Sequence, residues 1–357
     1  MEDRFQLRPT PGVLVATVLT LLLLLAACGN GAVETTSTEA PPSDGTSPDE
    51  VRSYVVGYSS TPGIADLGTF LTWDALRTRG IDVETRFFSD ADVVVQGMAR
   101  GDIDFATNMA AVAGMNARAQ GVPLKIFTGY VGPEFVLAGT SDINAPEDLN
   151  GTTTAMHAEG GQTDVFLRAL TAKYGLEDVE ILTIPNSSAR REALAQGLLD
   201  TAPLDLADAL TLVDQDPDKF HIVLFFGEEF ELSNSGTMAT EEFLSENSED
   251  VQTIVTTLVE TYRRINDDPE WAGEQALRFF GVQYDEQFDL LRDIIRNYAE
   301  RKLWDPDGGL NPDIAADTVE FNVTYGNLPE DAMDDIEEFY DFQFIDRTLD
   351  ELGPYGG

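Results

Sequence analysis

The stretch from Gly80 to Tyr130 constrains the fold of this chain most, because short apolar runs and helical patterns alternate in it. The apolar runs predict three strands, at Val83–Phe88, Ile103–Ala106 and Leu124–Tyr130. The segments between them predict two helices, at Ala91–Arg100 and Ala110–Gln120. Asp90 can cap the first helix, and Gly101 and Gly121 follow the two helices, where glycine adopts a positive φ without a steric clash. Such alternation is typical of a parallel sheet covered by helices.

A binding site is expected at one edge of this sheet, because ligands of open α/β sheets bind beyond the carboxyl ends of the strands. The residues after the second and third strands, Thr107–Met109 and Tyr130–Gly132, are therefore expected at the site. Among them we single out Asn108, Met109 and Tyr130 as candidate ligand contacts.

The rest of the chain continues the same alternation. Further strands are predicted at Tyr54–Tyr58, Phe135–Gly139, Thr152–Met156, Val179–Ile184 and His221–Phe226. Further helices are predicted at Asp66–Arg79, Gln162–Tyr174, Ser188–Gln196, Val251–Arg264, Trp271–Phe280, Glu286–Tyr298, Ile314–Tyr325 and Ala332–Tyr340. A glycine, two residues, an aspartate and a short strand occur at Gly101–Ala106 and again at Gly197–Ala202.

Three segments carry a resemblance to a known family: Gly-Ile-Asp-Val-Glu at 80–84, Arg-Gly-Asp-Ile-Asp-Phe-Ala at 100–106 and Gly-Val-Pro-Leu-Lys-Ile at 121–126. Their order resembles the first lobe of periplasmic substrate-binding proteins, in the NMT1/THI5-like and sulfonate/nitrate/taurine-binding family of ABC importers. Pro146–Gly151 resembles the segment that opens the second lobe in that family, although Thr152 stands where the family usually has lysine. The resemblance extends from Val51 to Tyr340.

The resemblance implies an α/β protein with the two-lobe periplasmic-binding-protein type II fold, in which helices cover two sheets and a cleft lies between the lobes. The length of 357 residues suits two domains. The expected domains are residues 51–138 and 237–345 for lobe I, 139–236 for lobe II and 346–357 for a C-terminal tail. Chain crossings are expected near Val136–Asp142 and Thr237–Ala239.

The N-terminus has the pattern of an export signal. Arg4 and Arg8 precede the apolar run Val13–Ala27, which is short for a membrane span of about 20 residues. Leu25-Ala26-Ala27-Cys28 resembles the bacterial lipobox, so residues 1–27 are expected to be removed and Cys28 to be lipidated. An uncleaved anchor is the alternative. Residues 28–50 are rich in Thr, Ser, Pro and Glu and are expected to form a disordered tether.

The chain is strongly acidic, with a formal net charge of −42 from 64 acidic and 22 basic residues. Such a surface argues against nucleic acid and anionic lipid as partners, so contact with the membrane is expected through the lipid anchor only. Adaptation to high salt and a simply acidic secreted protein both explain the charge.

The resemblance extends the candidate site to more loops. It adds Ser59, Ser60 and Thr61 after the first strand, although an ordinary capped turn explains them equally well. In the second lobe it adds His157, Gly160, Gly161, Gln162, Thr163, Asn186 and Asp205. Gly160–Thr163 opens a helix, so its free N–H groups are expected to seat an acceptor group of the ligand. Glu134, Glu159 and Asp205 would repel a strong anion, which favours a neutral or zwitterionic solute.

No motif for catalysis or metal binding is present in the sequence: HExxH, CxxC, GxSxG and the P-loop are missing. We expect no catalytic residue, no metal and no cofactor. His221 begins an apolar strand and is expected to be structural, whereas His157 either contacts the ligand or caps a helix.

The resemblance implies a monomeric extracytoplasmic protein that binds a small solute and delivers it to ABC permease subunits. Relatives bind sulfonates, nitrate, pyrimidines, flavins and aromatic acids, so the solute stays open. One alternative is an enzyme of the same fold that makes the pyrimidine precursor of thiamine with a pyridoxal cofactor and a cysteine-rich motif. Cys28 is the only cysteine here, which disfavours that alternative. A binding protein that serves a sensor is the other.

Overall fold

The computed structural model describes residues 51–131, 135–230, 232–284 and 287–356. By its internal contacts the chain divides into Met1–Ser47 and Pro48–Gly357, and the description concerns the second unit. The predicted export signal, the lipidation of Cys28 and the tether lie outside the described residues. Within the described part, no helix is both long and apolar enough to cross a membrane.

The first sheet has five strands: β1 (Arg52–Tyr58), β2 (Ile81–Phe87), β3 (Phe105–Ala110), β4 (Leu124–Val131) and β10 (Ser233–Thr240). Their order is β2-β1-β3-β10-β4. β1 pairs in parallel with β2 and β3, whereas β10 is antiparallel to both β3 and β4. The last strand in sequence thus returns from far along the chain and separates β3 from β4.

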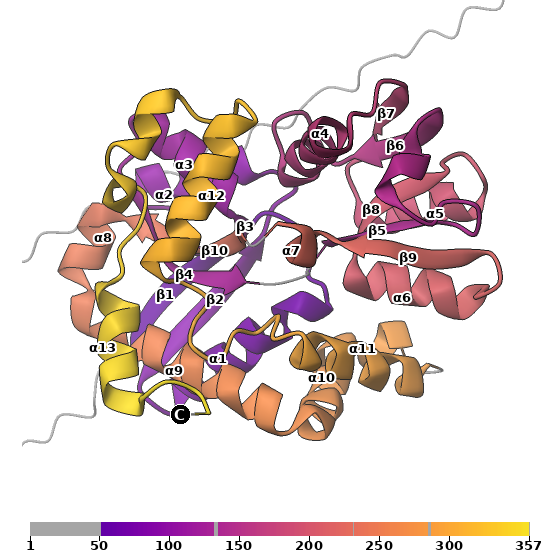
Figure 1. Ribbon diagram of the computed structural model, residues 1–357. Coiled ribbons are helices and arrows are strands. Elements are labelled where there is room, and N and C mark those ends of the chain that lie inside the picture. Colours follow the sequence, from indigo (N-terminus) through magenta and orange to yellow (C-terminus); the bar gives the residue numbers. More distant parts are fainter. Residues whose placement is uncertain (1–50, 132–134, 231, 285–286, 357) are drawn as a thin grey trace, which may run out of the picture. The chain divides into compact units, whose positions relative to one another are not determined.

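Helices cover both faces of this sheet. They are α1 (Leu67–Arg77), α2 (Ala91–Arg100), α3 (Ala111–Ala119), α8 (Glu241–Glu246), α9 (Ser248–Asp267), α12 (Pro312–Thr324) and α13 (Gln343–Leu352). In Figure 1, α2, α3 and α12 lie on one side of the sheet, and α1 and α9 on the other. Val56 and Phe105 are wholly buried in the core between these layers.

The second group of strands has two small sheets. β5 (Phe135–Thr140) pairs antiparallel with β8 (Thr201–Asp205) and β9 (Phe220–Phe225). β6 (Thr152–Met156) and β7 (Val179–Thr183) form a parallel pair. The expectation of two sheets in all is therefore corrected to three. β6 also lies against β8: the Asp200 N–H donates to the carbonyl of Thr153 at 2.9 Å, and the Thr153 N–H donates to Oδ2 of Asp200 at 2.8 Å.

Helices of the second group are α4 (Gln162–Tyr174), α5 (Ser187–Ala195), α6 (Leu206–Gln215) and the single turn α7 (Phe226–Glu229). Two further helices, α10 (Pro269–Tyr284) and α11 (Phe288–Glu300), follow α9 along the chain. A second core cluster includes Leu67 of α1, Leu206 of α6 and Ile294 of α11. Helix α1 beside the first sheet thus shares one apolar core with the second group and with α11.

Several predicted elements differ from the structure. The predicted helix at Ala332–Tyr340 is wrong: this stretch holds the short 3-10 turns η3 (Glu330–Met333) and η4 (Ile336–Glu338). Four helices were not predicted, α6, α7, α8 and α13, and α13 occupies part of the expected tail at 346–357. Thr107–Met109, expected to follow a strand, lie inside β3, and Asp205 is the last residue of β8. Two more 3-10 turns, η1 (Ile64–Asp66) and η2 (Pro146–Leu149), precede α1 and β6.

The chain changes sheets between β4 and β5 and again between β9 and β10. β5 belongs to the second group over its whole length, and β10 belongs to the first sheet over its whole length. The expected domain boundaries, between residues 138 and 139 and between residues 236 and 237, fall inside β5 and β10.

Candidate functional site

Asn108 lies where sequence analysis expected a ligand contact, and its backbone is unusual. It has φ 47°, a left-handed conformation that few residues other than glycine adopt. Its Nδ2 donates to Oδ1 of Asp66 at 2.7 Å, and its Oδ1 accepts from the Ser235 hydroxyl at 3.3 Å. Three separate segments therefore meet at Asn108: the turn before α1, strand β3 and strand β10.

Asp66 is a carboxylate that sequence analysis did not select. Its exposed fraction is only 2%, and its Oδ2 accepts the backbone N–H of Gly63 at 2.8 Å. Burial raises the pKa of Asp66 to about 6, although the hydrogen bonds from Gly63 and Asn108 act in the opposite direction. Asp66 thus holds a proton far more readily than an exposed aspartate does.

Asp205 is the predicted site residue at the end of β8, where it is the N-cap residue of α6. Its side chain makes no cap hydrogen bond, although aspartate is a preferred capping residue. The Tyr298 hydroxyl accepts the Ala207 N–H at 3.1 Å instead. Burial raises the pKa of Asp205 to about 7; the charges of Asp208 and Asp66 raise it further, and Arg190 lowers it.

Arg190 is a second residue that sequence analysis missed. Its exposed fraction is 2%, and its guanidinium donates to backbone carbonyls: Nε to Pro203 at 2.7 Å, and Nη1 to Ile184 at 2.8 Å and Pro185 at 3.2 Å. Burial lowers the pKa of Arg190, an effect that Asp205 and Asp208 oppose. The side chain therefore connects the residues that follow β7 to Pro203 of β8, two residues before Asp205.

The loop after β6 is closed by its own hydrogen bonds. The Thr163 hydroxyl, which is buried, accepts the His157 N–H at 2.7 Å, and Nδ1 of His157 donates to the carbonyl of Pro185. The Gly160 N–H donates to Oδ2 of Asp164 at 2.8 Å, and the Gly161 N–H to the carbonyl of Ala158 at 3.1 Å. Two of the N–H groups expected to be free for a ligand are thus used within the loop.

The remaining candidates fall into different environments. Met109 is wholly buried in the core cluster of the first sheet, and its selection as a ligand contact stays a prediction. Ser60, Thr61 and Asn186 are exposed, and Ser59 and Gln162 are half-buried. Tyr130 lies in β4 opposite Ser235, and its side chain is outside the described residues.

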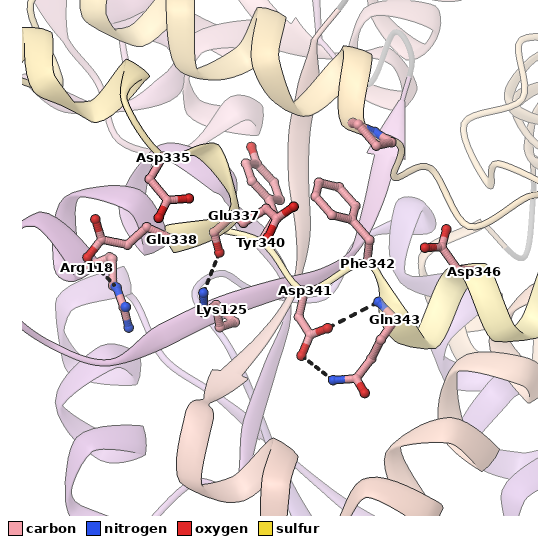
Figure 2. Close-up of a pocket in the computed structure, with 11 residues that line it drawn as sticks. Arg118, Lys125, Asp335, Glu337, Glu338, Tyr340, Asp341, Phe342, Gln343 and Asp346 are labelled. Atoms are coloured by element: carbon pink, nitrogen blue, oxygen red, sulfur yellow. Dashed lines mark hydrogen bonds and ion pairs between the residues drawn. The ribbon is translucent and has the colours of Figure 1, made fainter.

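A hollow of about 790 Å³ lies elsewhere, around the segment between α12 and α13. Figure 2 shows its acidic lining, with Arg118 and Lys125 already bound to Glu338 and to the backbone of Glu337. Its lining residues are Arg118, Lys125, Pro312, Asp335, Glu337, Glu338, Tyr340, Asp341, Phe342, Gln343 and Asp346. None of the candidate site residues is among them, so this hollow is separate from the Asp66–Asp205 region.

The described residues contain no group of three or more His, Cys, Asp or Glu side chains that could hold a metal ion. The candidate site contains the amide of Asn108, the carboxylates of Asp66 and Asp205, and the buried guanidinium of Arg190. Neither carboxylate forms an ion pair with a described residue. These groups can recognise a solute by hydrogen bonds and charge.

Solved structures with the same fold are periplasmic binding proteins. The sulfonate-binding protein SsuA of Methylobacillus flagellatus KT matches with a TM-score of 0.64 at 20% identity, over 86% of this chain and 97% of its own. The nitrate-binding protein NrtA of Synechocystis PCC 6803 matches with a TM-score of 0.66 at 13% identity, over 85% of this chain and 90% of its own. The aliphatic sulphonate binding protein SsuA of Escherichia coli matches with 0.63 at 16%, over 83% and 92%. At these identities the likeness shows the fold alone.

A search of curated proteins gives no match. The family model described as NMT1/THI5 like, however, matches residues 76–272, more than half of the chain. These residues include β2 to β9 with Asn108, Arg190 and Asp205, while Asp66 lies just before them. The expected family is therefore confirmed, and the chain belongs to the NMT1/THI5-like family.

Proposed function

We propose that this chain is a lipid-anchored extracytoplasmic protein that binds a small organic solute between two lobes and delivers it to ABC permease subunits. The observation that carries this proposal is the match to the NMT1/THI5-like family, on a fold shared with periplasmic sulfonate- and nitrate-binding proteins. Those structures cover at least 83% of this chain, so the likeness includes both groups of strands.

The site geometry supports solute binding by two lobes. Lobe I comprises the first sheet and contributes Asp66 and Asn108, and lobe II comprises the second group and contributes Asp205 and Arg190. In lobe II the Gln162 and Thr163 N–H groups at the start of α4 remain candidates for an acceptor group of the solute.

The N-terminal sequence supports the anchor. Export would require residues 1–27, and Cys28 after Leu25-Ala26-Ala27 would carry the lipid. Residues 28–50 would then connect the membrane to a binding domain that acts as a monomer.

The alternative enzyme of this family makes a thiamine pyrimidine precursor and depends on a cysteine-rich motif. This chain has no cysteine other than Cys28, so it lacks that motif. A binding protein that serves a sensor remains the second alternative, and a permease gene beside this one would separate the two.

A thermal-shift screen of the full-length chain tests solute binding. Alkanesulfonates, nitrate, aminopyrimidines, flavins and aromatic acids are the first probes. A solute at one hundred times its dissociation constant should stabilise the native state by about 2.7 kcal/mol. Conversion of a bound solute to product would instead favour the enzyme.

Fatty-acid labelling in a bacterial host tests the anchor independently, with Cys28→Ser as the matched control. Label in the wild-type chain that disappears in the control supports the anchor, and unlabelled wild-type protein refutes it.

A further inference from the structure

Asp66 and Asp205 come from different sheets, and one aromatic bridge fixes both of their turns. The Trp304 Nε1–H donates to the carbonyl of Ala65 at 2.9 Å. The ring of Trp304 packs edge-on against that of Tyr298, with centroids 5.4 Å apart. The Tyr298 hydroxyl accepts the Ala207 N–H at 3.1 Å. The neighbours of both aspartates thus contact one pair of buried aromatic side chains, which holds the two carboxylates at the junction between the sheets.

Neither carboxylate has an ion-pair partner among the described residues. The contrast lies close by: Asp208 forms an ion pair with Arg191 at 2.7 Å. Arg190, the buried cation behind Asp205, has its Nε and Nη1 committed to backbone carbonyls. Buried charges are costly unless they are paired, so this arrangement of two carboxylates with one guanidinium leaves an excess negative charge.

We infer that the solute carries a protonated nitrogen, as an ammonium, amidinium or guanidinium group, and that this nitrogen binds between Asp66 and Asp205. The inference rests on the proposed function and names the chemical class of its solute. Charge-assisted hydrogen bonds from such a group to two carboxylates are about twice as strong as neutral ones. Asn108 is a positioning residue, because its Nδ2 holds Oδ1 of Asp66 in place.

The raised pKa values of Asp66 and Asp205 agree with binding of a cationic solute. With a pKa of about 6 for Asp66 and about 7 for Asp205, the empty site keeps a proton that exposed aspartates would lose. The charged and titratable groups that face Asp205 are Asp208, Arg190 and Asp66, and Tyr58 faces Asp66. A cationic solute replaces the bound proton, so its affinity should rise with pH between about 6 and 8.

Matched pairs of probes that differ in one charge test the inference on the full-length chain. The pairs are benzylamine with benzyl alcohol and benzamidine with benzamide, and methanesulfonate and nitrate serve as anions. The variants are Asp205→Asn and Asp66→Asn, with Asp218→Asn as control, because Asp218 is exposed and α6 separates it from Asp205 along the chain. Calorimetry gives affinities, and the melting transition of each variant shows that it is folded.

The expected result is that the wild-type chain binds the cationic member of a pair at least tenfold more tightly than the neutral one. Asp205→Asn and Asp66→Asn should each abolish that preference, and Asp218→Asn should keep it. Preferential binding of neutral or anionic probes overturns the inference and leaves the proposed function standing. The same holds for a cation preference that survives both site variants. Binding of no probe here and of no solute in the earlier screen overturns both.

Discussion

Two buried acidic sites of this protein differ in what surrounds the carboxylate. Asp250 of α9, 7% exposed, forms an ion pair with Arg52 and accepts the Tyr54 hydroxyl, both from β1. Among the described residues, the carboxylate of Asp66, which is 2% exposed, accepts hydrogen bonds from two amide donors, the Gly63 backbone and the Asn108 side chain. The carboxylate of Asp250 is paired with a cation of the same chain, and this contact connects helix α9 to the first sheet. A carboxylate that lacks a counter-ion destabilises the empty protein and is available to a ligand.

The largest effect is expected from Arg190→Met, which tests whether Arg190 serves the backbone or neutralises Asp205. Its hydrogen bonds reach Pro203, Ile184 and Pro185, so losing them should lower the free energy of unfolding by roughly 3 kcal/mol or more. Arg190→Lys should not restore stability, because an ammonium group cannot reproduce the planar geometry. Urea denaturation measures both.

The matched control is Arg191→Met, which removes a partly exposed ion pair with Asp208 and should cost at most about 1 kcal/mol. If Arg190→Met and Arg191→Met lowered the free energy of unfolding equally, the hydrogen bonds from Arg190 to backbone carbonyls would not be what stabilises β7 and β8.

Asp250→Asn should destabilise the protein by about 2 kcal/mol, because a charge-assisted contact to Arg52 and the hydrogen bond from Tyr54 are weakened. The exposed half of the Arg52 side chain limits the loss, since solvent screens that part of the interaction. If this variant were as stable as the wild type in urea, the distinction between the two acidic sites would fail.

The double variant Asp66→Asn/Asp205→Asn should raise the stability of the protein, whereas the variants above lower it. Both pKa values are raised above the ordinary 3.8, to about 6 and about 7, so the folded state binds more protons than the unfolded state across this range. Stability from these groups therefore falls as pH rises from about 4 to 7. The double variant should be more stable than the wild type by about 2 kcal/mol at pH 8, after allowance for the partial exposure of Asp205.

Melting temperatures at pH 5 and pH 8 measure this effect. The advantage of the double variant should shrink towards pH 5, where the wild-type carboxyl groups are largely protonated. A gain of equal size at both pH values would point to a cause other than ionisation.

The smallest effect per residue is expected from repulsion between the acidic residues on the surface. With a net charge of −42, self-repulsion should lower the melting temperature at low ionic strength, and molar sodium chloride should raise it. The rise should be the same in the wild type and in the Asp66–Asp205 double variant, because salt screens buried charges poorly. A melting temperature independent of salt would show that the surface acids are spread too widely to repel one another.

Local signals in the sequence predicted the elements that have clear ends. α2 matches its predicted range because Asp90 caps it, with the Asp92 N–H as donor at 2.8 Å, and Gly101 ends it at φ 75°. α4 ends in the same way at Gly175, with φ 63°. Ala332–Tyr340 has no such signals, and its backbone instead bridges to the first sheet at Tyr340 and Ile126. Tertiary pairing there overrides a weak helical pattern.

The site was predictable only in part. Asn108 and Asp205 follow from their positions near the carboxyl ends of strands. Asp66 and Arg190 do not, because their roles depend on burial that contacts distant in sequence create. Arg190 and Arg191 are adjacent in one polar helix, and nothing local indicates that the first is buried beneath two strands while the second faces Asp208.

The hydrogen bonds of Arg190 also bear on the order of folding. Its carbonyl partners are 5, 6 and 13 residues away along the chain, whereas Asn108 is 42 residues from Asp66 and 127 from Ser235. Contacts between near neighbours require little loop closure and form quickly, whereas those across long loops form late. The part of the binding site around Arg190 is thus expected to assemble early as a local unit. The part around Asp66 is completed only when β10 (Ser233–Thr240), about two thirds of the way along the chain, has paired between β3 and β4.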